Sequence, residues 1–137
     1  MIQSTRKMDN KIKQLRKGVL ELAILGSLYH ESHYGYSLIK SISDEGDIEI
    51  TEGTIYPILG RLAKEDLVQS EWMESKQGPP RKYYSLTEKG KAAFEVLHSE
   101  FAKLVKMVRS SSAIPDRKPQ PLKGEKIDMK QESEHGK

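Results

Sequence analysis

The sequence predicts a mainly α-helical fold with a small β-hairpin, and three observations support this fold class. Apolar residues recur every three or four positions in four stretches, which is the spacing of one face of a helix. Two short strand-like stretches, 67–75 and 81–86, flank a Gly-Pro-Pro turn. The last helical stretch repeats apolar residues at alternating steps of three and four, as a coiled-coil seam does. We therefore expect the order helix, helix, helix, strand, turn, strand, helix.

Composition limits the classes of protein that the chain can belong to. With 137 residues and 36% hydrophobic content, one modest domain is expected. The absence of cysteine excludes disulfides and thiolate zinc sites. No apolar run approaches the roughly 20 residues that span a bilayer, and the start of the chain has no signal-peptide pattern, so we expect a cytoplasmic protein without a membrane partner. A net charge of +3 suits a polyanionic partner but is weak evidence alone.

The first helix is predicted to end near His30. Its apolar or small residues form one stripe with steps of four and three: Met8, Ile12, Leu15, Val19, Leu22, Gly26 and Tyr29. Two interpretations of residues 1–14 stay open, a basic arm or an extension of the helix, because Gly18 costs a helix about 1 kcal/mol relative to alanine. Residues 6–17 hold six cations and only one acid.

Two shorter helices are expected next. Tyr36 and Ile39, with Ile42 as a further candidate, mark the buried side of a second helix that ends near Asp44. A third helix is predicted over 52–66, with Thr51 as its N-cap. The core side of the third helix is expected to hold Ile55, Ile58, Leu59 and Leu62. Pro57 falls inside this helix, where a proline bends or weakens it, and such a local conflict is typical of a functional segment.

The final helix is predicted to run from a Thr87 cap to about Arg109. Its apolar residues form a coiled-coil seam, which predicts a homodimer: Phe94, Leu97, Phe101, Leu104 and Val108. An apolar stripe on a long helix would otherwise be an uncovered surface. After residue 110 the chain turns to serine, proline and mixed charges, so 111–137 is expected to be disordered. The expected segments are 1–14 (arm or helix extension), 15–86 (three helices and the hairpin), 87–110 (dimerisation helix) and the tail.

This order of elements is that of a winged helix-turn-helix with a long C-terminal dimerisation helix. Such a fold places its third helix in the major groove and its hairpin, the wing, along the adjacent backbone. Thr54 and Tyr56 are the expected groove contacts, with Arg61 and Lys64 adding cationic reach. The expected wing contacts are Lys76, Gly78, Pro79, Arg81 and Lys82.

Other interpretations of these patterns compete with DNA binding. A merely kinked third helix and an ordinary solvated hairpin would look similar, and the acidic linker 44–52 would repel phosphate unless it faced away. An enzyme is disfavoured, because the chain has no phosphate-binding glycine loop and its four histidines are scattered over polar segments. No catalytic residue, metal ligand or cofactor is predicted. A winged helix used for protein contacts, without DNA, is the remaining alternative.

Four motifs in order resemble the PadR family of bacterial transcriptional regulators. They are Leu-Arg-Lys-Gly-Val-Leu-Glu-Leu at 15–22, Tyr-Gly-Tyr-Ser-Leu at 34–38, Gly-Thr-Ile-Tyr-Pro-Ile-Leu-Gly-Arg-Leu at 53–62, and Gly-Pro-Pro-Arg-Lys-Tyr-Tyr-Ser-Leu-Thr-Glu-Lys-Gly at 78–90. The resemblance covers about 15–109 and is closest to the small subfamily with a single C-terminal helix. It implies that Tyr36, Thr54, Tyr56, Pro57 and Arg61 belong to the helix-turn-helix, and Gly78, Pro79, Arg81 and Lys82 to the wing.

The resemblance also implies a homodimer that binds an inverted-repeat operator in double-stranded DNA and usually represses. Its terminal helices would form the dimer interface, here Leu15, Val19, Leu22, Phe94, Leu97, Phe101, Leu104 and Val108. In this family small hydrophobic or aromatic effectors weaken DNA binding, and in some members an aromatic residue of the final helix stacks on the ligand. Phe94 and Phe101 are the aromatics of that helix here, and seam positions of this kind are more often core than ligand contacts.

Overall fold

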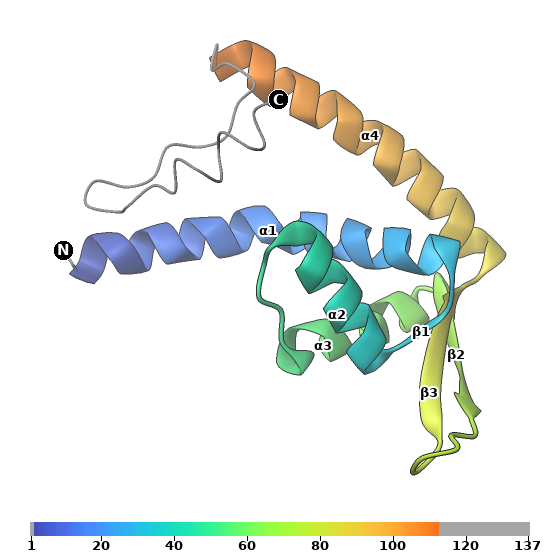
Figure 1. Cartoon of the computed structure of the whole chain (residues 1–137). Coiled ribbons are helices and arrows are strands. Elements are labelled where there is room, and N and C mark those ends of the chain that lie inside the picture. The colour runs from blue at the N-terminus through green and yellow to red at the C-terminus, as the bar shows by residue number, and fades with distance from the viewer. Residues whose placement is uncertain (1, 113–137) are drawn as a thin grey trace, which may run out of the picture. The chain divides into compact units, whose positions relative to one another are not determined.

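Figure 1 shows the computed structural model of the chain, which describes residues 2–112. Its elements are α1 (Ile2–His30), β1 (His33–Tyr34), α2 (Gly35–Gly46), α3 (Glu52–Lys64), β2 (Val68–Met73), β3 (Arg81–Leu86) and α4 (Glu88–Ser112). The predicted fold class is confirmed. Residues 1–103 and 104–137 form two units, and of the second only the end of α4 is described. Because α4 includes Ser111 and Ser112, the helix is longer than predicted; the rest of the expected tail lies outside the described residues.

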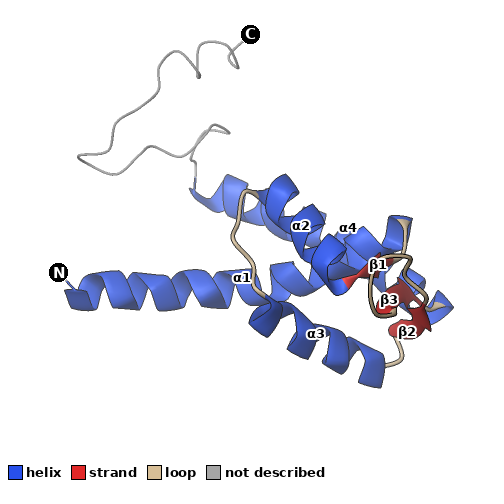
Figure 2. Cartoon of the chain, turned by 60° about the horizontal axis from the view of Figure 1, so that its bottom comes forward, coloured by secondary structure: helices blue, strands red, loops and turns tan. Residues whose placement is uncertain are grey.

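The first helix is one continuous element of 29 residues. A side chain at Gly18 would meet nothing within 4 Å, so this glycine lies on an open face and does not interrupt the helix. In the structure, residues 2–14 are part of α1. The N-terminal part of α1 therefore extends beyond the part that packs against the rest of the domain, as Figure 2 shows.

The core lies where α1, α2, α3 and the sheet meet. Its buried apolar side chains are Ile24, Leu25, Leu28, Leu38, Ile42, Ile55, Ile58, Leu59, Leu62, Val68, Tyr84 and Leu86. The four residues predicted for the core side of α3 are all buried, as expected. On α2 the prediction was wrong in part, because Tyr36 is 62% exposed and Leu38 takes the buried place instead.

The predicted stripe of α1 is not the side through which this helix enters the core. Met8, Leu15 and Val19 are exposed, and α1 enters the core through Ile24, Leu25 and Leu28. The stripe instead continues the side of α1 that meets α4, where Phe94 packs against Gly26 and lies 5.0 Å, ring to ring, from Tyr29. The spacing thus grouped the residues of one face of α1 correctly but did not predict that α4 covers the C-terminal part of this face.

The sheet has the order β1-β3-β2, and both pairings are antiparallel. Val68 pairs with Leu86 at the buried base of the hairpin, and Met73 pairs with Arg81 at its outer end. The strand predicted over 67–75 is shorter than expected, whereas β3 has its predicted bounds. The base anchors the hairpin in the core, and its turn projects away from the helices (Figure 1).

Candidate nucleic-acid interface

The face of α3 opposite the core forms a ridge of two glycines, a proline and a lysine. Gly53, Pro57, Gly60 and Lys64 follow one another at steps of four, three and four, and all of them are exposed. A side chain at Gly60 would meet nothing within 4 Å, and Pro57 has no N–H to donate to the carbonyl of Gly53. A partner surface can therefore approach the backbone of α3 closely along this ridge.

Tyr56 and Thr54 lie on the two edges of this ridge. Tyr56 remains 42% exposed, and its ring lies directly against Gly35, where any side chain would collide with the Tyr56 hydroxyl. Gly35 begins α2, so the glycine of the Tyr-Gly-Tyr motif fixes where Tyr56 points. Thr54 is exposed, and its hydroxyl lies 3.3 Å from that of Thr51. Thr51 stands at the predicted N-cap position, but its side chain makes no capping bond.

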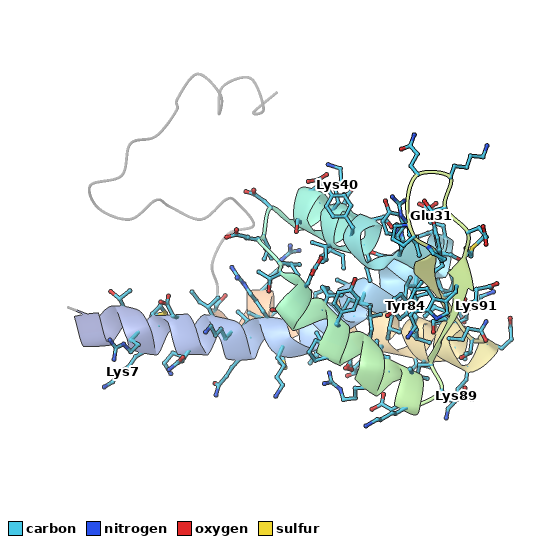
Figure 3. The ribbon with its side chains drawn as sticks, turned by 90° about the horizontal axis from the view of Figure 1, so that it is seen from below. Lys7, Glu31, Lys40, Tyr84, Lys89 and Lys91 are labelled. Atoms are coloured by element: carbon cyan, nitrogen blue, oxygen red, sulfur yellow. The ribbon has the colours of Figure 1, made fainter. Side chains whose placement is uncertain are left out.

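The phenol of Tyr84 lies behind this surface, in the core side of the sheet. Burial raises the pKa of Tyr84 above the ordinary tyrosine value, and the nearby Tyr56 raises it a little further. Tyr84 therefore stays neutral at physiological pH, and its side chain is part of the hydrophobic core. Figure 3 looks at this side of the molecule, with α3 in front of α1 and the hairpin beside it.

Arg61 is engaged within the domain. Its Nη2 donates to Oε1 of Glu21 at 2.9 Å, which ties α3 to α1. The hydrogen bond and the negative charge of Glu21 raise the pKa of Arg61, so the guanidinium stays charged. The predicted DNA contact at this position is thus paired with a carboxylate, and the structure gives Arg61 a role in orienting α3. Lys64, at the end of the ridge, is exposed.

The two cations of β3, Arg81 and Lys82, lie on opposite faces of the hairpin, because alternate residues of a strand point to opposite sides. Arg81 lies with its guanidinium carbon 4.4 Å from the centre of the Tyr34 ring. Tyr34 in turn lies 6.5 Å, ring to ring, from the exposed Tyr36. The guanidinium group of the wing arginine thus lies over the ring of Tyr34, and the ring of Tyr36 stacks beside Tyr34.

Lys82 lies on the other face of the hairpin, the one that continues into the core. Its ammonium group is 5.9 Å from the ring centres of both Trp72 and Tyr84. Trp72 pairs with Lys82 across the strands and is 67% exposed. In the turn, Lys76 and Pro79 are exposed, and Gly78 has φ 127°, a conformation that favours glycine. The hairpin therefore offers a cation and a large apolar ring on the side of α3.

The site residues predicted from the sequence leave out four contributors to this surface: Gly53, Gly60, Trp72 and Tyr34. Gly53 and Gly60 could have been found by extending the Pro57 position in helical steps away from the core residues. Trp72 could have been found from strand alternation, which places it on the face of Val68 but beyond the reach of the core. The ring of Tyr34 under Arg81 carries no signal in the sequence, because the contact joins residues 47 positions apart.

The acidic linker between α2 and α3 lies at the N-terminal end of the recognition surface. Asp47, at the C-cap of α2, has φ 54°, and Asp44 pairs with Lys40 at 3.5 Å. Glu52 begins α3, where a carboxylate interacts favourably with the helix dipole. The hairpin follows from the other end of α3, so the acidic and basic segments are separated along the chain by the whole helix.

The residues predicted for dimerisation lie on α1 and α4. Leu15, Val19, Leu97, Leu104 and Val108 are exposed, and Leu22, Phe94 and Phe101 are partly buried. Within one chain, Phe94 is covered by Gly26 and Tyr29, and the Tyr29 hydroxyl donates to Glu95 at 2.6 Å. That hydrogen bond and the charge of Glu95 raise the pKa of Tyr29. The five exposed positions are uncovered in the part of the chain that the structure describes.

No helix among residues 2–112 has the length and apolar character needed to cross a membrane. The described residues also contain no group of three or more histidine, aspartate or glutamate side chains placed to hold a metal ion.

Comparisons with known proteins agree with this geometry. The fold is similar to that of a PadR-like transcription factor from Bacteroides fragilis, with 42% identity and a TM-score of 0.63 over 74% of this chain and 97% of that one. A PadR family regulator from Eggerthella lenta has 30% identity and a TM-score of 0.71 over 84% and 100% of the two chains. A PadR-like regulator from Bacillus cereus has 35% identity and a TM-score of 0.67 over 74% and 99%.

The sequence also matches a bacterial relative and a family model. The chain is 30% identical over 94 residues to an uncharacterised protein of Lysinibacillus sphaericus, which covers 67% of this chain and 86% of that protein. The model of the transcriptional regulator PadR-like family matches residues 24–96, which include the core, the ridge of α3 and the whole hairpin. The chain therefore belongs to the PadR-like family of transcriptional regulators.

Proposed function

We propose that the chain represses transcription as a homodimer that binds an inverted-repeat operator in double-stranded DNA. The observation that carries this proposal is the ridge of α3, where Gly53, Pro57 and Gly60 leave the helix backbone open opposite the core. A helix fits the major groove, and small residues on its outer side let it enter deeply. The relatives from Bacteroides fragilis and Bacillus cereus are described as a transcription factor and a transcriptional regulator.

Each part of the surface has a task in this proposal. Tyr56 and Thr54, on the edges of the ridge, contact base edges and give sequence discrimination. Lys64, Lys76 and Lys82 contact phosphates, and Gly78 and Pro79 let the turn approach the backbone. Arg61, through Glu21, holds α3 at the angle that the groove requires. Arg81, stacked on Tyr34, contacts phosphate from the outer face of the hairpin, next to Tyr36.

The homodimer forms through the exposed apolar faces of α1 and α4. Leu15 and Val19 on α1, and Leu97 on α4, are uncovered by their own chain. A second copy related by a two-fold axis would bury these positions and place two α3 helices at half-sites about 34 to 36 Å apart, one turn of DNA. The dimer is therefore the unit that reads an inverted repeat.

A small hydrophobic effector would act at this interface. Phe94 is already covered by Gly26 and Tyr29, so Phe101 is the aromatic residue of α4 that remains for a flat ligand. A compound bound between the terminal helices would change the angle between the two copies and hence the spacing of the α3 helices. Release of operator DNA by members of a panel of flat hydrophobic compounds is the corresponding measurement.

The test of DNA binding is the salt dependence of affinity. Fluorescence anisotropy is measured on two labelled duplexes of equal length, one from upstream of the protein's own gene and one of random sequence, between about 50 and 200 mM salt. We expect tighter binding to the upstream duplex and a linear fall of log affinity with log salt on both. Absence of binding to either duplex at the lowest salt would contradict the proposal and leave a winged helix that contacts proteins.

A further inference from the structure

The N-terminal part of α1 is a long exposed helix that the DNA-binding domain does not cover. Every described side chain from Thr5 to Val19 is exposed, and the first fully buried residue is Ile24. This part precedes the segment that the family model matches. At about 1.5 Å per residue it extends on the order of 25 Å, and a free helix of that length is marginally stable in water. Its pattern of residues therefore indicates what lies against it.

Two opposite stripes run along this part of the helix. One is apolar and consists of Met8, Ile12, Leu15 and Val19, all exposed. The other, which we call the basic stripe, consists of Arg6, Lys13 and Lys17, at steps of seven and four. Steps of four, three and seven keep residues on one side of a helix, and the two stripes lie on opposite sides. The exposed part of α1 is thus amphipathic, with one side apolar and one side cationic.

The side to which each stripe points follows from the C-terminal part of α1, which packs against the rest of the domain. In helical steps, the apolar stripe continues into Gly26 and Tyr29, which contact Phe94 and Glu95 of α4. The basic stripe continues into Leu20, Ile24 and Leu28, which face the core formed with α2, α3 and the sheet. The basic stripe therefore points to the side on which α2 and α3 lie, which is the lower side of α1 in Figure 1.

The cations of the basic stripe are not neutralised within the described residues. No salt bridge there involves Arg6, Lys13 or Lys17, and Asp9 is the only acid between positions 5 and 19. Glu21, the next acid on α1, is already paired with Arg61. Three cations on one line, which form no salt bridge with any acid of residues 2–112 and lie on the same side of the molecule as α3, match the phosphate backbone of a duplex that extends past α3.

We propose that the basic stripe is a second DNA-binding element, which contacts the phosphate backbone beside the segment that α3 reads. This inference rests on the proposed DNA binding by α3. The apolar stripe then faces the partner copy while the basic stripe faces the duplex, so both sides of the extension are used. Because the contacts go to phosphate, they add affinity on every sequence and do not contribute to discrimination.

The alternative partner of the basic stripe is the acidic linker 44–52 of a second copy, and the experiment distinguishes this linker from DNA. The test variant carries Arg6→Gln, Lys13→Gln and Lys17→Gln. The matched control carries Lys7→Gln, Lys11→Gln and Arg16→Gln, which removes the same charge from the same helix on its other sides. Lys7 is labelled in Figure 3. Glutamine keeps helix propensity close to that of lysine and arginine.

Affinity for a random-sequence duplex is measured against salt, and the mass of the free protein by sedimentation. We expect the slope of log affinity against log salt to fall in magnitude by about 0.9 for each phosphate that the test variant no longer neutralises. The control variant should change it much less, with dimers retained in both. Equal slopes for the two variants would overturn the proposal, and so would loss of dimers in the test variant with an unchanged slope, which would favour the acidic linker. Failure of the wild-type protein to bind DNA would instead remove the proposed function itself.

Discussion

Thr87 joins the hairpin to α4 through a single hydroxyl group. This hydroxyl donates to the carbonyl of Asp66 at 2.7 Å and accepts from the N–H of Gly90 at 2.9 Å. Gly90 is required beside it, because a side chain there would collide with the carbonyl of Leu67. Since Thr87 directly follows β3, these contacts fix the direction in which α4 leaves the DNA-binding domain.

Replacing Thr87 with valine should lower the free energy of unfolding by about 1 to 2 kcal/mol, because the variant can form neither the capping bond nor the bond to Asp66. Thermal or urea unfolding at fixed protein concentration measures the change. The matched control is Thr51→Val, since Thr51 is the N-cap residue of α3 but makes no side-chain capping bond, and this substitution should cost only a few tenths of a kcal/mol. Equal destabilisation of the two variants would show that the Thr87 bonds do not stabilise the fold.

Single residues also show what a sequence can and cannot predict. Alternation along a strand places Arg81 and Lys82 on opposite faces of the hairpin, so the sequence alone predicts that separation. It does not predict the pairing of Arg61 with Glu21, because this pair joins side chains 40 positions apart that only the packing of α3 on α1 brings together. The DNA contacts predicted for these residues remain predictions.

At the scale of elements, periodicity predicted which residues share a face but not what covers the face. The stripe from Met8 to Tyr29 was correctly grouped, yet the core is filled by Ile24, Leu25 and Leu28. Both faces of α1 are apolar near its C-terminal end, and the spacing of apolar residues does not show which of the two faces enters the core. The four core residues of α3 were predicted correctly because that helix has one apolar face and the ridge of glycine and proline opposite.

The apolar face of α4 leads to a prediction about assembly. Leu97→Glu should convert the proposed homodimer to monomers in sedimentation, because a carboxylate would be buried without a partner in the proposed interface. Val96→Glu is the control, since Val96 is also exposed on α4 but lies on another side of the helix. If Leu97→Glu remained dimeric, the interface would have to lie elsewhere.

At the scale of the whole molecule, the proposed mechanism combines one rigid domain with two long helices. The core holds α3 and the hairpin in one orientation, and the exposed faces of α1 and α4 remain for a second copy. Symmetry would then convert one reading helix into a pair at a fixed spacing. A substitution on the ridge of α3 should therefore abolish function without affecting the fold.

Gly60→Gln tests this central claim most directly. The site is open, so the variant should fold and gain about half a kcal/mol of helix stability, while the new side chain stands between α3 and the groove. Gly18→Gln is the matched control, an equally open glycine on α1. We predict that Gly60→Gln weakens binding to the upstream duplex at least tenfold while Gly18→Gln binds like the wild type. Unchanged affinity in a folded Gly60→Gln protein would contradict the entry of α3 into DNA.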